Sequence, residues 1–423
     1  MSETVPPRPR AIALGVQLPG VSDDEHAASL AELSRLAKTL GYDVTARVTQ
    51  KRAALAPGAV VGEGKLEELV RLAADAEAVL VDHEITPSQA RNLEKATGKE
   101  VLDRTAVILA IFHRHARSRE ARLQVELARL AYLAPRLRES GAGRDRQGGG
   151  IGSKGAGESH LELDRRKLRD RMAELRRELA AIEREGGTRR RRRGEHATSA
   201  LVGYTNAGKS SLMRALTGSP VLVADQLFAT LDTTVRAIEP PTRPRILVSD
   251  TVGFIKKLPH DLVASFRSTL EEARDADLQL HVVDASDPAF RAQLAVTREV
   301  LREIGADGAP VLLVLNKRDR LDAEREQALA AEFPDAILVS AKQPGDVARL
   351  RERILAFFEQ DMEEAELRVP YALSKLLAEI HASCRVLSES HDEHGTRVRL
   401  RARPEQMGRL RAALATGGEA AER

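Results

Sequence analysis

A glycine-rich loop that ends in a lysine and a serine is the segment of this sequence best suited to chemistry. A short apolar strand at 198–202 leads into Gly203-Tyr204-Thr205-Asn206-Ala207-Gly208-Lys209-Ser210, and a helix is expected to start there. Glycines allow backbone N–H groups to approach phosphates, and the helix start adds its positive dipole end. Lys209 is expected to neutralise the β- and γ-phosphates and the Ser210 hydroxyl to ligate Mg²⁺. This P-loop therefore predicts a bound nucleoside triphosphate.

A second motif follows where a strand ends. Residues 245–249 are expected to form a strand that ends at Asp250 and continues as Thr251-Val252-Gly253. A carboxylate at that position can hold Mg²⁺ through water, and the Gly253 N–H can bind the γ-phosphate. The motif is common, but its place after the P-loop favours a functional role. We expect Lys209 and Gly253 to be the residues that contact the reacting phosphate.

Two further motifs are suited to recognising a guanine base. The apolar strand 311–315 opens into Asn316-Lys317-Arg318-Asp319, and the strand 337–339 precedes Ser340-Ala341-Lys342. The Asp319 carboxylate can accept hydrogen bonds from both guanine N1–H and the 2-amino group, a pattern that adenine lacks. Lys317 is expected along the base plane, and Asn316 is expected to connect this loop to the P-loop. The ordered series predicts hydrolysis of GTP to GDP and phosphate.

The segment 225–234, Asp-Gln-Leu-Phe-Ala-Thr-Leu-Asp-Thr-Thr, is expected to be the first switch. It must supply a threonine to Mg²⁺ and the γ-phosphate. The sequence offers Thr230, Thr233 and Thr234, and position alone does not choose among them.

Two residues bear on the rate of hydrolysis. Phe254 follows Gly253, where many GTPases have a glutamine that orients the attacking water. Because phenylalanine cannot form that hydrogen bond, we expect slow hydrolysis by the free protein, with a partner or an ion completing the site. Asn206 is of the type that helps to hold K⁺ in some GTPase families. A purely structural role for Asn206 in the loop is an equal alternative.

The elements around these motifs divide the chain into several α/β parts. Its 423 residues suggest about three domains. We expect an α/β fold with a P-loop GTPase domain, an N-terminal parallel α/β domain, an antiparallel helical hairpin and a small C-terminal α+β domain. The expected bounds are 11–116 for the N-terminal domain, 117–187 for the hairpin with a glycine-rich basic loop at 141–157, 188–197 for an arginine-rich linker, 198–358 for the GTPase domain and 365–423 for the C-terminal domain. Residues 11–116 alternate short apolar strands with amphipathic helices, which predicts a parallel sheet. In the C-terminal domain we expect helices at 372–382 and 404–414 and a strand at 396–401.

Composition limits the compartment and the partners. No stretch approaches the ~20 apolar residues of a membrane span, and the single cysteine, Cys384, excludes an internal disulfide and fits a reducing cytosol. A cytoplasmic monomer is expected. The net charge is only +3, but residues 136–193 contain 18 lysines and arginines against 10 acidic residues. This excess favours a polyanionic partner such as RNA, with a solvated coiled coil as the alternative; the run 189–193 fits a solvated linker equally well.

Several stretches outside the nucleotide motifs resemble the HflX family of ribosome-associated GTPases. In the first 140 residues these are Asp82-His83-Glu84, Arg91-Asn92-Leu93-Glu94, Asp103-Arg104-Thr105, Leu123-Gln124-Val125-Glu126-Leu127 and Pro135-Arg136-Leu137. The glycine loop Gly149-Gly150-Ile151-Gly152 with Gly157-Glu158 is similar too, and so are Phe228-Ala229-Thr230-Leu231-Asp232 and 250–255. The resemblance covers nearly the whole chain beyond the first ten residues.

The resemblance implies binding to the large ribosomal subunit, with the hairpin approaching the peptidyl-transferase region through ribosomal RNA. It also implies splitting of stalled or idle ribosomes under stress, favours Thr230 as the Mg²⁺ ligand beside Ser210, and makes Phe254 the family's own residue. Ser153-Lys154 and Ser159-His160 depart from the family pattern, which affects the expected RNA contacts.

Two other functions stay open on sequence grounds. A signalling GTPase could use its N-terminal domain to bind a protein effector instead of ribosomal RNA. An RNA-modifying enzyme with a GTPase module would need a second cofactor site, and residues 11–116 offer no readable motif for one.

Overall fold

The computed structural model describes residues 8–142, 160–193, 197–219, 226–243, 245–257 and 267–421. They fall into two compact units. The N-terminal unit comprises 1–186 with 224–232 and 257–268; the C-terminal unit comprises 187–223, 233–256 and 269–423. Nearly all of the expected glycine-rich loop 141–157 lies outside the described residues, as does Asp225 of the expected first switch.

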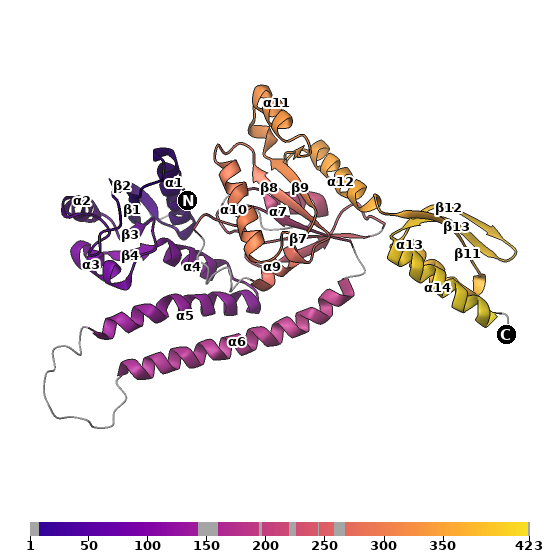
Figure 1. Cartoon of the computed structure of the whole chain (residues 1–423), viewed down its shortest axis with the longest axis horizontal. Helices are drawn as coiled ribbons and strands as arrows, with labels where there is room; N and C mark the ends of the chain where they lie inside the picture. Colours follow the sequence, from indigo (N-terminus) through magenta and orange to yellow (C-terminus); the bar gives the residue numbers. More distant parts are fainter. Residues whose placement is uncertain are drawn as a thin grey trace, which may run out of the picture. The chain divides into compact units, whose positions relative to one another are not determined.

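The N-terminal unit contains a four-stranded parallel sheet in the order β2-β1-β3-β4 (Figure 1). Its strands are β1 (Arg10–Gln17), β2 (Asp43–Lys51), β3 (Ala78–Val81) and β4 (Glu100–Asp103). Its helices are α1 (Asp23–Leu40), α2 (Glu63–Ala73), α3 (Pro87–Thr97) and α4 (Arg104–His115). Helix α1 packs with α4, and α2 packs with α3. The parallel α/β fold predicted from the alternation of apolar strands and amphipathic helices is confirmed.

Local sequence explains where these helices start. Ser22 caps α1 in a capping box with Glu25, and Thr86 caps α3 in the same way with Gln89, one residue before Pro87. Each cap satisfies backbone N–H groups that the first helical turn leaves without partners. The two central strands, β1 and β3, are almost fully buried, β3 along its whole length, as expected for a parallel sheet covered on both faces. The edge strand β2 is largely exposed.

A pair of long helices follows, α5 (Arg119–Ala142) and α6 (His160–Arg193), which run side by side in Figure 1. Leu123 of α5 is buried with Leu175 and Leu179 of α6. Two ion pairs give the direction, because Arg119 binds Glu178 whereas Glu126, further along α5, binds Arg171, which comes earlier in α6. The helices are therefore antiparallel, and the predicted hairpin is confirmed.

The expected linker at 188–197 is corrected in part, because α6 continues through Arg193. Gly186 and Gly187 lie inside this helix, and the boundary between the two units falls between them. Glycine costs a helix only about 1 kcal/mol per residue, and arginine is a good helix former. The glycine pair therefore weakens the helix without ending it.

The C-terminal unit contains a six-stranded sheet in the order β10-β9-β8-β5-β7-β6, in which only β6 is antiparallel to its neighbour. Its strands are β5 (Ala197–Val202), β6 (Thr234–Ala237), β7 (Ile246–Asp250), β8 (Leu278–Asp284), β9 (Val311–Asn316) and β10 (Ile337–Leu338). Its helices are α7 (Lys209–Thr217), α9 (Arg267–Arg274), α10 (Phe290–Glu303), α11 (Ala323–Glu332) and α12 (Pro344–Glu359). The start of α9 is assigned to the N-terminal unit.

The same unit ends in a three-stranded antiparallel sheet, β11-β13-β12, packed with two helices. The sequence predicted the helices α13 (Ser374–Ser383) and α14 (Pro404–Ala421) and the strand β13 (Gly395–Ala402). It did not predict β11 (Glu363–Val369) or β12 (Arg385–Asp392). Both lie at the edges of the sheet and are mostly exposed, and few of their residues are apolar. Among the described helices, none is long and apolar enough to cross a membrane.

Asp103, at the end of β4, anchors the hairpin to the N-terminal sheet. Its buried carboxylate accepts hydrogen bonds from the Ala106 N–H at 2.8 Å, the Tyr132 hydroxyl at 2.9 Å and the Arg136 guanidinium at 2.7 Å. The first contact caps α4, and the other two come from α5. Arg136 also lies over the Tyr132 ring, 3.4 Å from its centroid. One carboxylate therefore joins a strand and two helices.

We predict that Asp103→Ala destabilises this junction by about 2–4 kcal/mol, because it removes a helix cap and the carboxylate partner of a half-buried arginine. Hydrogen exchange of α4 and α5 in the full chain measures the loss. Asp322→Ala is the matched control, since Asp322 caps α11 from an exposed position and its loss costs about 1 kcal/mol. Equal effects of the two substitutions on their own helices would contradict the anchoring role.

Candidate functional site

The P-loop follows β5 and is built by close backbone approaches. Gly203 has φ 149°, and a Cβ there would collide with the carbonyl oxygen of Val282 on β8. Gly208 has φ 96° and lies against the Asn316 side chain, which also leaves no space for a Cβ. Only glycine fits both positions. Helix α7 then begins at Lys209, so the loop ends at a helix N-terminus, where anions are favoured.

Lys209 is buried at the centre of this loop. Its side chain donates hydrogen bonds to the carbonyl oxygens of Gly203 and Tyr204, each at 3.0 Å. The residue is only 6% exposed, and burial lowers the pKa of its ammonium group to about 8, although Asp250 acts in the opposite direction. The ammonium is thus held by the loop's own carbonyl groups, in surroundings where an additional negative charge would be favoured.

Ser210 and Asp250 form a set of hard oxygen ligands next to Lys209. The Ser210 hydroxyl donates to a carboxylate oxygen of Asp250 at 2.7 Å, which joins the start of α7 to the end of β7. Hydroxyl and carboxylate oxygens are the ligand types that Mg²⁺ prefers. These residues therefore fit the expected metal.

The segment after Asp250 lies directly on the P-loop. The Thr205 N–H donates to the Phe254 carbonyl at 2.7 Å, and the Phe254 N–H donates to the Gly203 carbonyl at 3.1 Å. Gly253 is so close that a Cβ would lie 2.7 Å from the Thr205 Cα and 3.0 Å from the Lys209 amine. The Phe254 side chain is buried, so it is not placed to hold a water molecule. Gly253 brings its backbone next to Lys209, as its predicted role requires.

A contact that the sequence did not suggest joins the same two segments. The Tyr204 hydroxyl accepts a hydrogen bond from the Lys256 N–H at 2.6 Å, and Tyr204 is nearly buried. No sequence signal distinguishes this tyrosine from the variable residues of a P-loop.

Asn316 connects the predicted base-recognition loop to the P-loop, as expected. Its side-chain amide donates to the Ala207 carbonyl at 2.8 Å, and its carbonyl oxygen accepts from the Ala341 N–H at 3.3 Å. A single side chain therefore holds three separate motifs together.

Lys317 also binds the P-loop. Its ammonium donates to the Asn206 carbonyl at 2.8 Å and to the Asp284 carboxylate at 2.7 Å. Sequence reasoning missed Asp284, which ends β8. Its position at a strand end beside the other motifs was the available signal, because parallel strands present their carboxyl ends at one edge of the sheet.

Asp319 lies among hydrogen-bond donors from the last motif. The Ser340 hydroxyl donates to one of its oxygens at 2.7 Å and Lys342 to the other at 3.1 Å. Burial acts to raise the pKa of this carboxyl, but these two donors outweigh it and the net pKa is below the usual value. Asp319 is therefore ionised at neutral pH and can act only as an acceptor. The Arg318 side chain instead pairs with Glu326 and Asp346.

The residues expected for the first switch do not all fall in one unit. Phe228 to Asp232, including Ala229, Thr230 and Leu231, belong to the N-terminal unit, whereas Thr233 and Thr234 belong to the C-terminal unit. Thr234 begins β6 and is paired in register with Asp250 of β7. The Mg²⁺ role of Thr230 therefore stays a prediction.

The low pKa of Lys209 gives a testable pH dependence. The free protein already carries the Lys209 proton below about pH 8, whereas above it phosphate binding must take up a proton. We expect the Kd for GDP to be flat below that pH and to rise by up to about tenfold per pH unit above it. Titration with a fluorescent GDP from about pH 6.5 to 9.5 covers the window.

Lys209→Arg is the control, because a guanidinium does not titrate in this range. Its binding is expected to be weaker but independent of pH. An identical slope in this variant would assign the dependence to another group.

Comparison with known protein families matches three of the predicted regions of the chain. A family model described as GTP-binding GTPase N-terminal matches residues 27–113, and one described as GTP-binding GTPase Middle Region matches 115–193. A third, described as 50S ribosome-binding GTPase, matches residues 198–317. The matches thus cover the N-terminal α/β fold, the hairpin and the nucleotide motifs up to Lys317.

Curated relatives extend the similarity over the whole chain. GTPase HflX of Gluconacetobacter diazotrophicus is 57% identical over 451 residues, which cover 98% of this chain and 99% of that protein. GTPase HflX of Escherichia coli is 39% identical and covers 89% of each chain. Among solved structures, a GTP-binding protein from Sulfolobus solfataricus in complex with GDP is 26% identical over 82% of this chain and 97% of that one, with a TM-score of 0.45. The chain therefore belongs to the HflX family of GTPases, and its reaction is the hydrolysis of GTP.

Proposed function

We propose that this GTPase binds the large ribosomal subunit in the cytoplasm, is stimulated by it, and dissociates stalled or idle ribosomes. The observation that carries the proposal is a basic helical hairpin in the same chain as a complete guanine-nucleotide site. The match of residues 198–317 to the 50S ribosome-binding GTPase family supports the same partner.

The charges on α6 support an RNA contact because arginines dominate its exposed side. Arg166, Arg177 and Arg184 are exposed and, by helical periodicity, lie on the side away from the buried seam of Leu175 and Leu179. Arg169 and Arg176 are exposed beside them. One acidic residue, Asp170, shares that side. A basic face of this kind can contact phosphates and release their counterions.

The nucleotide site supports hydrolysis by positioning and charge. Lys209 and the Gly253 N–H would contact the γ-phosphate, and the P-loop N–H groups would hold the remaining phosphates. Mg²⁺, held by Ser210 and Thr230 with Asp250 behind a water molecule, would supply charge neutralisation when bound. The proposal also includes a K⁺ ion that Asn206 would help to hold. Asp319 and Lys317, with the backbone of 340–342, would recognise guanine.

The first test concerns stimulation. Because Phe254 cannot orient water, the purified protein is expected to hydrolyse GTP slowly, and large subunits are expected to raise the rate at least about tenfold, or roughly 1.4 kcal/mol of barrier. The rate of phosphate release, measured with and without purified large subunits, gives this increase. A fast basal rate that is indifferent to subunits would contradict the proposal and favour a signalling GTPase.

Three variants separate the role of the hairpin from that of the pocket. Arg176→Glu with Arg177→Glu is expected to abolish most of the stimulation, while Arg298→Glu with Arg302→Glu on the exposed face of α10 makes the same charge change elsewhere. Deletion of 141–157 is expected to abolish subunit splitting. Nucleotide affinity should stay within about twofold in all three, since none of the changes alters a nucleotide motif. A loop-deleted protein that splits ribosomes normally would refute the RNA role of the loop.

A separate prediction tests guanine recognition. Asp319→Asn places an amide where two guanine donors are expected, so the preference for GTP over inosine triphosphate, which lacks the 2-amino group, is expected to shrink by about 1–3 kcal/mol. Competition binding measures it. Asp322→Asn is the matched control, three residues away, because asparagine caps a helix as well as aspartate does. An unchanged preference in Asp319→Asn would remove Asp319 from the base site.

A further inference from the structure

The two loops expected to recognise guanine, 316–319 and 340–342, share a buried partner that belongs to neither motif. Asp346 lies in the first turn of α12 and is only 5% exposed. A carboxylate in a first helical turn is stabilised by the positive end of the helix dipole. A buried carboxylate also needs hydrogen-bond donors around it. Those that Asp346 receives come from both loops and from its own helix.

One carboxylate oxygen of Asp346 holds the main chain of Ser340. The Ser340 N–H donates to it at 2.8 Å, and Ser340 is completely buried. The Ser340 hydroxyl donates to Asp319 at 2.7 Å. Ser340 is therefore bound by Asp346 through its main chain and by Asp319 through its side chain. Both bonds restrict the main chain that follows, which is expected to meet the guanine oxygen.

The other oxygen of Asp346 accepts hydrogen bonds from two arginines. Arg349, one turn further along α12, donates at 2.6 Å, and Arg318 of the loop 316–319 donates at 3.3 Å. The Arg349 guanidinium also donates to the Leu338 carbonyl at 3.2 Å, two residues before Ser340. Arg349 therefore holds the chain on one side of Ser340 while Asp346 holds Ser340 itself.

Arg318 connects the two loops through both its main chain and its side chain. Its N–H donates to the Val339 carbonyl at 3.0 Å. Its guanidinium is shared between Glu326 of α11 and Asp346 of α12. The side chain of this motif residue is therefore engaged by acidic residues outside the motif. One of them, Asp346, is also the residue that binds Ser340.

We propose that Asp346 is a positioning residue for guanine recognition: it holds the main chain of 340–342 through Ser340 and thereby sets the preference for an oxygen at position 6 of the base. This inference rests on the proposed contact between that main chain and guanine. A hydrogen bond weakens steeply as its angle departs from linear. A loop held at Ser340 therefore recognises the oxygen better than a loop that is free to turn.

The oxygen at position 6 can be tested apart from the groups that Asp319 recognises. 6-Thioguanosine triphosphate keeps N1–H and the 2-amino group but presents sulfur, a weak acceptor, to residues 340–342. The wild type is expected to prefer GTP over this analogue by about five- to tenfold, the contribution of one neutral hydrogen bond. In Asp346→Ala this preference is expected to fall to about twofold or less. Competition binding measures both preferences.

Glu326→Ala is the matched control. It removes the other carboxylate from the Arg318 guanidinium but leaves the acceptor of the Ser340 N–H in place. This variant is expected to keep the wild-type preference for GTP over the thio analogue. Hydrogen exchange of residues 338–343 gives a second readout, since it is expected to accelerate in Asp346→Ala and to stay unchanged in Glu326→Ala.

Asp346→Asn separates the hydrogen bond to Ser340 from the stability of the fold. The asparagine oxygen can still accept from the Ser340 N–H, so this variant is expected to keep Ser340 protected from exchange and to retain the preference. It also serves as the test if the alanine variant does not fold. The inference is overturned if Asp346→Ala keeps the wild-type preference. It is equally overturned if Asp346→Asn loses the preference while the Ser340 N–H stays protected.

Asp319→Asn, measured against inosine triphosphate, tests the base site independently. If Asp319→Asn loses its preference for GTP while Asp346→Ala keeps the preference for oxygen over sulfur, only the role of Asp346 is refuted. If neither variant changes its preference, the proposed base site is refuted together with it. A wild type that binds GTP and the thio analogue equally would refute the contact of 340–342 with the guanine oxygen.

Discussion

The backbone of residues 203–208 is the point to which the other parts of the nucleotide site are attached. Gly203 binds the segment after Asp250, Asn206 binds Lys317, and Ala207 binds Asn316. Lys209 is bound by carbonyl groups of the same loop. Because these are main-chain contacts, they constrain the path of the chain more than the identity of the side chains. The glycines matter for the same reason, since a Cβ at Gly203 or Gly208 would displace β8 or the base-recognition loop.

Much of this site could be predicted because its motifs are local in sequence and each follows an apolar strand. Their order then places them at one edge of a parallel sheet, and the contact of Asn316 with the P-loop agrees with the expected connection. The roles of the individual residues remain predictions, as do the domain boundaries. Asp284 and Tyr204 were not found, because an aspartate at a strand end and a tyrosine in a loop carry no distinctive pattern by themselves.

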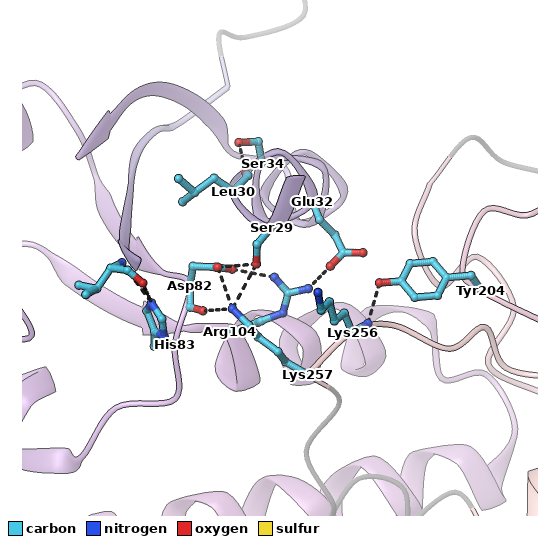
Figure 2. A network of polar contacts seen from close by, with 11 residues as sticks. Ser29, Leu30, Glu32, Ser34, Asp82, His83, Arg104, Tyr204, Lys256 and Lys257 are labelled. Atoms are coloured by element: carbon cyan, nitrogen blue, oxygen red, sulfur yellow. Dashed lines mark hydrogen bonds and ion pairs between the residues drawn. The ribbon is translucent and has the colours of Figure 1, made fainter. Parts of the chain in front are cut away.

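Contacts between residues that are far apart in the chain could not be predicted from the sequence. Lys257 looks like one of two adjacent surface lysines, yet its ammonium contacts Asp82, 175 positions away in the chain (Figure 2). Asp82, Arg104 and Glu32 lie in separate elements, and no periodicity links them. A buried ionic cluster is a weak source of stability, because desolvation offsets most of its attraction, but it does select one arrangement of charges over others. The edge strands β11 and β12 were missed for a different reason, since most of their residues are exposed and few are apolar.

The continuity of α6 has a mechanical consequence. A helix of 34 residues is about 50 Å long and behaves as a stiff rod. Only three residues separate its last residue, Arg193, from β5, the strand that ends at the P-loop. A force applied near His160 would be carried along the rod as strain, and Gly186 with Gly187 is its most compliant point. Bending would concentrate at these two glycines. The glycine pair would therefore limit how much of the strain reaches β5, the strand that leads into the P-loop.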